Sequence, residues 1–438
     1  MASTERTASV LNASSGLGER VRAARRELGM SQSQLAGAEL TKGFISQLEA
    51  GLVRPSIRSL QVIATRLGKS LDYFLGDEPL AATKRLAFHR LAAEAAVERA
   101  DWAEVRRHVA SALEQSPEPR ERGRLLVALA SAELGEGQRE AAFDRVNEAQ
   151  GLLDVASDPA EVATLHMLRG RAYAEIGQLV AATEAYETAR DTVDRYEVAE
   201  PRLRARLFVA LGTIYRRLNR TAKAMTTYEK ALSFASRTSE LRTAARGYMG
   251  IAVTLYDSGE LDAAIGNYRR ALELFERVSD ASFELNVLQS LAAIQFEQGE
   301  VGTARDAASR ALRRAIEVGD PHWAAVAETV LARVSLAEGR HDEALRLARH
   351  AERVLLDSGD DLQRADALRV IGAIHEAKGE AAEADEAYRG SIEVLKAIED
   401  KADLSAVAAE YAQKLRTRGD LEAAFEMLEL ARGSAAKR

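Results

Sequence analysis

The chain has 438 residues and a formal net charge of −7, so it is long enough for more than one domain. It contains no cysteine, which excludes disulfides and thiolate chemistry and favours a reducing cytoplasm. No apolar run is long enough to span a membrane, and residues 1–15 lack the apolar core of a signal peptide. Seven prolines in a chain rich in alanine, leucine, glutamate and arginine predict an all-α protein.

Residues 1–15 offer little apolar surface and are predicted to form a disordered tail. The first helix is predicted over residues 18–28, with Val21 and Leu28 facing inward and Gly29 ending it. Positive charge is concentrated in this part of the chain: residues 16–76 hold nine Lys/Arg and five Asp/Glu, a net +4, whereas the rest of the chain is acidic. A basic head on an acidic body is typical of a phosphate-binding module.

Ser31 to Gly51 reads as two short helices joined by a tight turn. The first, from Ser31 to about Ala38, opens with a capping box between Ser31 and Gln34. The second, from about Lys42 to Ala50, has Ile45 and Leu48 on one apolar stripe, and Gly51 can supply a left-handed cap. Short polar or cationic residues, able to approach base edges and phosphates, occupy its outward positions: Lys42, Gly43, Ser46 and Gln47.

A further helix is predicted to begin at Ser56 and to end at Gly68. Its apolar stripe and the residues after it would complete a five-helix core: Ile57, Leu60, Ile63, Leu67, Leu71, Phe74 and Leu75. Residues 77–79 are the predicted linker, which separates a domain over 16–76 from a second domain over 80–438.

Residues 17–76 resemble the Xre/phage-repressor family of helix-turn-helix domains. The similarity rests on Arg20 and Arg25, the segments MSQSQLA (30–36) and FISQLEAG (44–51), Arg54-Pro55-Ser56, and the LG-S-LDYFL pattern of residues 67–75. It implies a five-helix lambda-repressor-like domain whose second helix of the pair enters the major groove of DNA.

The resemblance also implies how this domain would contact DNA. Gln32 would hold a phosphate, Gln47 could pair with an adenine edge, and the arginines would meet phosphates or merely solubilise the surface. Since one module contacts few bases, we expect a homodimer on an inverted repeat, with two modules about 34 Å apart. The predicted DNA-binding residues are Gln32, Thr41, Lys42, Gly43, Ser46, Gln47, Arg20, Arg54 and Arg58.

From residue 80 onward the sequence repeats with a period of about 40 residues. Alanine always stands five positions after the turn residue, and a small residue always stands seven positions before it. Such a pattern predicts antiparallel helix pairs that stack on one another, with tyrosine rings filling the space beside the small residues. The turn residues are Gly137, Gly177, Asn219, Gly259, Gly299, Gly339, Gly379 and Gly419.

This pattern resembles the tetratricopeptide repeat (TPR), most clearly at Gly170, Tyr173, Gly177, Ala182 and Tyr186. A weaker unit centred on Ala100-Asp101-Trp102 brings the array to about nine helix pairs, an α-solenoid. The resemblance implies a concave groove lined by the first helix of each pair. Its groove positions fall here on Arg171, Arg206, Arg216, Arg217, Arg246, Tyr256, Asn286, Gln289, Phe296, Arg333 and Arg369.

The groove residues allow two interpretations. Asn286 and Gln289 could hydrogen-bond an extended peptide while arginines take carboxylates, or the groove could simply be solvated. No catalytic constellation, metal-ligand spacing or phosphate-binding glycine loop is present, so we expect no enzyme and no cofactor. The scattered histidines fit packing, as at His375.

The combination resembles the peptide-sensing RRNPP regulators of bacterial quorum sensing. It implies a cytoplasmic, sequence-specific transcriptional regulator whose array dimerises and senses a peptide or protein. The alternative is an interaction scaffold in which the array binds a protein partner and the helix-turn-helix serves as a docking or dimer module. Operator, ligand and direction of regulation stay open.

Overall fold

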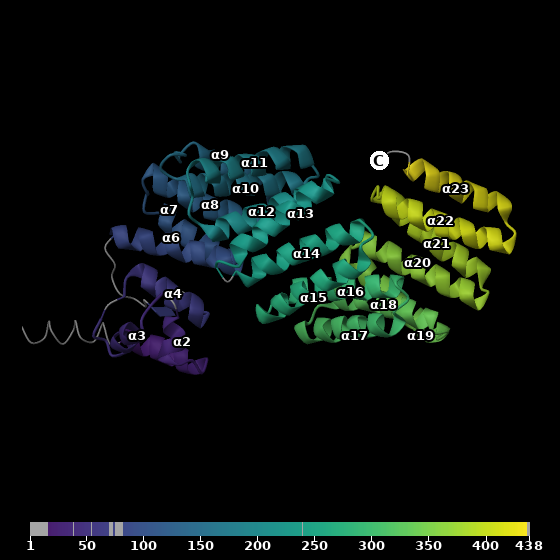
Figure 1. Cartoon of the computed structure of the whole chain (residues 1–438), viewed down its shortest axis with the longest axis horizontal. Coiled ribbons are helices and arrows are strands. Elements are labelled where there is room, and N and C mark those ends of the chain that lie inside the picture. The colour runs from purple at the N-terminus through teal and green to yellow at the C-terminus, as the bar shows by residue number, and fades with distance from the viewer. Residues whose placement is uncertain are drawn as a thin grey trace, which may run out of the picture. The chain divides into compact units, whose positions relative to one another are not determined.

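The computed structural model describes residues 16–37, 39–53, 55–69, 73–74, 82–238 and 240–435. Every regular element among these residues is a helix, as the sequence predicts, and no strand occurs in the described chain. The chain divides into two compact units, Met1–Asn219 and Arg220–Arg438. Figure 1 shows the helices in chain order. The predicted tail (1–15) and linker (77–79) lie outside the described residues.

The N-terminal head contains a helix over residues 16–27, α2 (Gln32–Ala36), α3 (Lys42–Glu49) and α4 (Ile57–Leu67). The predicted capping box of Ser31 and Gln34 is present, and Ser56 caps α4 by accepting a hydrogen bond from the Ser59 amide at 3.0 Å. Gly68 ends α4 in the left-handed region, at φ 60°.

The predicted core of the head is largely confirmed. Its buried side chains come from all of these helices and from residues 73–74: Val21, Leu35, Ile45, Leu48, Leu60, Ile63, Leu67 and Phe74. The prediction for Leu28 is wrong, because this side chain is 52% exposed. The first helix stops at residue 27, and the left-handed turn at Gly29 directs Leu28 out of the core. Leu71 and Leu75 lie outside the described residues.

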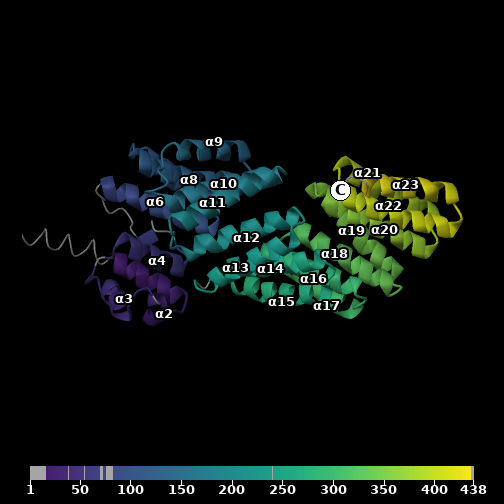
Figure 2. The same cartoon turned by 45° about the horizontal axis from the view of Figure 1, so that its top comes forward.

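The head packs on the first helix of the array, α6 (Ala82–Arg99), through α4 (Figures 1 and 2). Phe88 and Ala92 of α6 are 5% and 4% exposed and belong to the same apolar cluster as the head core. The Gln61 side chain donates to the Leu91 carbonyl at 3.3 Å. α6 therefore contributes both to the core of the head and to that of the array.

Unit 1 continues with antiparallel helix pairs, as both views show. In the pairs α6–α7, α8–α9 and α10–α11 the first helix contacts its partner closely, and α8 also contacts both α6 and α10, as first helices of successive pairs do. The remaining helices of unit 1 are α7 (Trp102–Leu113), α8 (Pro119–Gly135), α9 (Arg139–Gln150), α10 (Pro159–Glu175), α11 (Leu179–Arg195) and α12 (Pro201–Arg217).

Unit 2 follows the same plan. Together the two units contain eighteen array helices, α6 to α23, in the described chain, which matches the prediction of about nine pairs. Those of unit 2 are α13 (Thr221–Ala235), α14 (Leu241–Asp257), α15 (Leu261–Arg277), α16 (Ala281–Glu297), α17 (Val301–Val318), α18 (Pro321–Ala337), α19 (His341–Ser358), α20 (Asp361–Lys378), α21 (Ala381–Ala397), α22 (Lys401–Arg418) and α23 (Leu421–Ala435).

The repeat positions have the structural roles that the sequence predicts. Each predicted turn residue adopts a positive φ, from 55° at Asn219 to 87° at Gly419. A Cβ atom added to Gly170 would lie 2.9 Å from the ring of Tyr186. The tyrosine ring fills the space beside the glycine, so the two helices of the pair approach closely.

Candidate nucleic-acid interface and ligand groove

The second helix of the helix-turn-helix, α3, has one buried and one exposed face. Ile45 and Leu48 are 0% and 1% exposed. Thr41 caps the helix: its Oγ1 accepts from the Phe44 amide at 3.1 Å, and its hydroxyl hydrogen can still be donated outward. The predicted groove-facing residues of this helix are all exposed: Lys42, Gly43, Ser46 and Gln47.

A buried carboxylate holds α3 from behind. The side chain of Glu49 is fully buried and receives two hydrogen bonds from Arg25, at 2.5 and 2.9 Å. Gln32 donates a third at 2.9 Å, and Arg22 lies 3.6 Å away. Burial alone would raise the pKa of Glu49, but the hydrogen bonds from Arg25 and Gln32 and the nearby charges outweigh it and lower the pKa. Glu49 thus locks α3 to the first helix and to α2.

A second arginine fixes the turn between α2 and α3. Arg66 of α4 donates to the carbonyl oxygens of Leu35 and Ala36 and forms an ion pair with Glu39 at 2.7 Å. A Cβ at Gly37, which has φ 54°, would meet the Arg66 guanidinium at 2.6 Å. The sequence alone indicates no role for Glu49 or Arg66. The pattern that could have identified them is a single charged residue on the inward face near the end of a helix.

The other predicted DNA-binding residues lie in different settings. Gln32 begins α2 as predicted, but its amide is bound to Glu49. Arg20 donates twice to the Phe74 carbonyl, at 3.0 and 2.7 Å, so its guanidinium is used inside the head. Arg58 is exposed on the first turn of α4, while Arg54 lies outside the described residues.

The first helices of the array line a concave face in each unit. In unit 1, Arg206 of α12 pairs with Glu98 of α6, across the intervening α8 and α10. In unit 2, Gln289 of α16 donates to Gln363 of α20 at 3.4 Å, across α18. Side chains from non-adjacent helices can meet in this way only if the face curves inward.

The predicted groove residues of unit 2 lie on these first helices, and several have partners within the array. Arg333 of α18 donates to Asp366 of α20 at 3.0 Å. Asn286 is half-buried, one turn before Gln289 on α16. Arg246 of α14 lies over the ring of Phe283 of α16, with 4.5 Å between the guanidinium carbon and the ring centroid. These first helices therefore present amides, arginines and an aromatic ring, several of which are already paired within the array.

Tyr256, at the end of α14, is 38% exposed and donates to Glu297 of α16 at 2.8 Å. Burial, followed by the hydrogen bond to this carboxylate, raises the pKa of the Tyr256 hydroxyl to about 12. At neutral pH it is thus a neutral donor. In unit 1, Arg206 and the half-buried Arg216 lie on α12.

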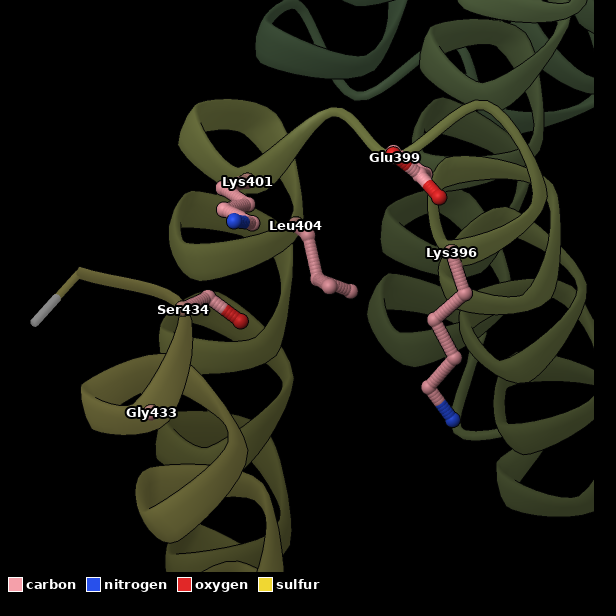
Figure 3. Close-up of a pocket in the computed structure, with 6 residues that line it drawn as sticks. All are labelled: Lys396, Glu399, Lys401, Leu404, Gly433 and Ser434. Atoms are coloured by element: carbon pink, nitrogen blue, oxygen red, sulfur yellow. The ribbon is translucent and has the colours of Figure 1, made fainter. Parts of the chain in front are cut away.

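A small open cavity of about 350 Å³ lies near the end of the array and apart from these residues (Figure 3). Lys396, Lys401 and Leu404 contribute to its lining beside the end of α23.

Within the described ranges, no group of three or more His, Cys, Asp or Glu side chains is placed to hold a metal ion. His375 is 3% exposed and is held by Glu380 at 2.5 Å, as expected for a packing residue. Of the helices described, none is both long and apolar enough to cross a bilayer.

These features define a helix-turn-helix head followed by a solenoid of TPR-type helix pairs. The family comparison agrees: residues 21–74 match the helix-turn-helix family HTH_3, and residues 199–359 match the MalT-like TPR region. Both matches are to binding modules. No curated protein sequence matches the chain.

Three solved structures share this fold at low sequence identity. The apo form of RapI has a TM-score of 0.65 at 16% identity, over 81% of this chain and 98% of RapI. The apo quorum sensor NprR from B. thuringiensis has a TM-score of 0.63 at 12% identity, over 81% and 99% of the two chains. A STAND protein with a TPR sensor, PH0952 from Pyrococcus horikoshii, reaches 0.52 at 14% identity, over 95% and 71%. The chain thus shares the fold of the RRNPP regulators, which include Rap and NprR.

Proposed function

We propose that this protein is a cytoplasmic, sequence-specific transcriptional regulator that binds operator DNA as a homodimer. Its α3 lies in the major groove, and its array senses a peptide or protein ligand. One observation supports this most directly: Lys42, Ser46 and Gln47 are exposed together on a helix that Glu49 holds in place from behind. A fixed helix with a polar outer face is what base recognition requires.

The contacts are assigned by chemistry. Gln47 can form two hydrogen bonds with an adenine edge, and Gly43 allows the helix to approach the bases closely. Lys42 and the Thr41 hydroxyl can bind phosphates beside the start of α3, and Arg58 can bind one at the start of α4. Arg20 is left out of this set because its guanidinium binds the Phe74 carbonyl.

The test is a binding titration of the full chain against genomic fragments upstream of its own gene, at several salt concentrations. Once a site is found, Gln47→Ala should cost about 1–3 kcal/mol and relax specificity at one base position. Arg58→Ala should weaken binding to all sequences alike and reduce the salt slope by about 1. Gln413→Ala and Arg416→Ala, at exposed positions of α22, are matched controls. Binding without sequence selectivity would contradict the proposal.

For the array, we propose that a peptide lies along the first helices of unit 2. Asn286 and Gln289 would bind its backbone, and Arg246 or Arg333 would take a carboxylate. Mass spectrometry of peptides that co-purify with the native protein tests this assignment. Asn286→Ala should abolish co-purification, whereas Asn267→Ala, which removes a half-buried amide on the second helix α15, should not. Equal retention by both variants would place the ligand elsewhere.

A further inference from the structure

The helix α23 exposes an apolar stripe. Leu421, Phe425 and Leu428 are 66%, 64% and 52% exposed. Their spacing of four and three residues places them on one side of the helix. Exposed apolar patches of this kind mark interaction sites.

In other second helices of the array, positions equivalent to part of this stripe are buried. The position of Phe425, six residues after the turn glycine, is occupied in α15 by Ile265, which is only 7% exposed. At the position of Leu428, nine residues after the turn residue, the side chain is at most 5% exposed in each second helix from α9 to α21: Val146, Tyr186, Tyr228, Tyr268, Ala308, Ala348 and Tyr388.

At Tyr388 and Phe143 the cover includes the first helix of the next pair. The ring of Tyr388 stacks on Tyr411 of α22 with centroids 4.9 Å apart, and its hydroxyl donates to Glu410 at 2.9 Å. At the other register position, Phe143 of α9 packs against Tyr173 of α10 at 5.1 Å. The stripe on α23 therefore continues an interface that the array uses repeatedly, and its shape fits a helix.

The charges beside the stripe indicate the chemistry of that helix. Glu422, Glu426 and Glu429 are exposed on one flank. Two copies of α23 packed antiparallel would place these acidic flanks against each other, which is unfavourable. Within the array, by contrast, Arg418 of α22 reaches back to form an ion pair with Asp385 of α21. The helix that covers α21 thus supplies a basic side chain to an acidic one on α21.

We propose that the Leu421–Phe425–Leu428 face of α23 binds an amphipathic helix of a partner protein, with lysine or arginine flanking its apolar side. It would cover α23 as α22 covers α21. This binding site is separate from the DNA-binding head and from the groove, so the proposal does not depend on either function.

The probe is a fluorescent synthetic peptide with the sequence of residues 401–418, the array's own first helix α22, which has a net charge of +2. Anisotropy titration with the full chain should give saturable binding. Phe425→Glu should weaken it at least tenfold. Ile316→Glu is the matched control, since Ile316 is 66% exposed, close to the 64% of Phe425, but lies on α17. It should change the affinity less than twofold. A peptide with K401E, K414E, R416E and R418E should bind at least tenfold more weakly.

Three results would overturn the proposal: no saturable binding to the wild-type chain, equal losses in Phe425→Glu and Ile316→Glu, or equal affinity for the acidic peptide. Sedimentation adds a fourth. If the wild-type chain forms a dimer that Phe425→Glu abolishes and the peptide does not compete, the face belongs to a second copy. Matching thermal unfolding curves for the two variants would show that both are folded, as expected for exposed positions.

Discussion

Replacing Glu49 by glutamine tests whether the buried charge network fixes the recognition helix. The substitution keeps the shape of the side chain and one acceptor oxygen but removes the negative charge. Arg25, whose side chain is only 12% exposed, would then keep its charge without its carboxylate partner. Gln32 would lose its charged acceptor as well. Both effects act on α3, because Glu49 is its last residue.

The size of the effect follows from this burial. Removing one partner of a buried ion pair costs about 3–5 kcal/mol. Arg22 is half-exposed and the glutamine retains one hydrogen bond, so the lower end applies, about 3 kcal/mol. That value corresponds to a roughly 100-fold shift in the local opening equilibrium.

Hydrogen exchange of the full chain measures this shift directly, because it reports the stability of each segment separately. Amides of α3 should exchange roughly 100-fold faster in Glu49→Gln, while those of α17 should be unchanged and serve as the internal control. Because the folded pKa of Glu49 lies below its ordinary value of 4.5, the wild-type carboxylate stabilises the head above about pH 4.5. This contribution is lost as the pH falls through the folded pKa, a loss that Glu49→Gln should lack. Less than threefold faster exchange at neutral pH would refute the reasoning.

Gly170→Val should destabilise unit 1 by about 1–3 kcal/mol in urea unfolding, because its Cβ meets the Tyr186 ring at 2.9 Å. A much smaller additional loss when Tyr186→Ala is combined with it would confirm the contact, and full additivity would contradict it. Phe88→Ala should cost about 3–5 kcal/mol and speed hydrogen exchange in both α4 and α6, since Phe88 belongs to the head core; faster exchange in α6 alone would disprove a shared core. Tyr256 should ionise at about pH 12. The difference in ultraviolet absorbance between the wild type and Tyr256→Phe during an alkaline titration measures this pKa. A midpoint near 10 would show that neither burial nor the hydrogen bond to Glu297 acts on the hydroxyl.

The sequence predicts the fold well because the fold depends on local and periodic signals. The capping box at Ser31 and the recurring turn glycines determine helix ends within a few residues. The 40-residue period then makes each pair a copy of the last, so a single interpretation extends along the array. Leu28 is the instructive exception. It continues the apolar spacing of the first helix, but the helix ends one residue earlier, and a pattern alone does not locate that end.

Side-chain pairings depend on the tertiary structure, and the sequence predicts them poorly. The spacing of α3 correctly separates Ile45 and Leu48 from Lys42 and Gln47, because a helix has only one inward face. Arg206 and Glu98 are 108 positions apart, however, and meet only because the first helices curve around a concave face. A sequence does not distinguish an arginine that is available to a ligand from one that already binds a carboxylate. The groove arginines could thus be placed on the correct helices, while their existing partners followed only from the curvature of the array.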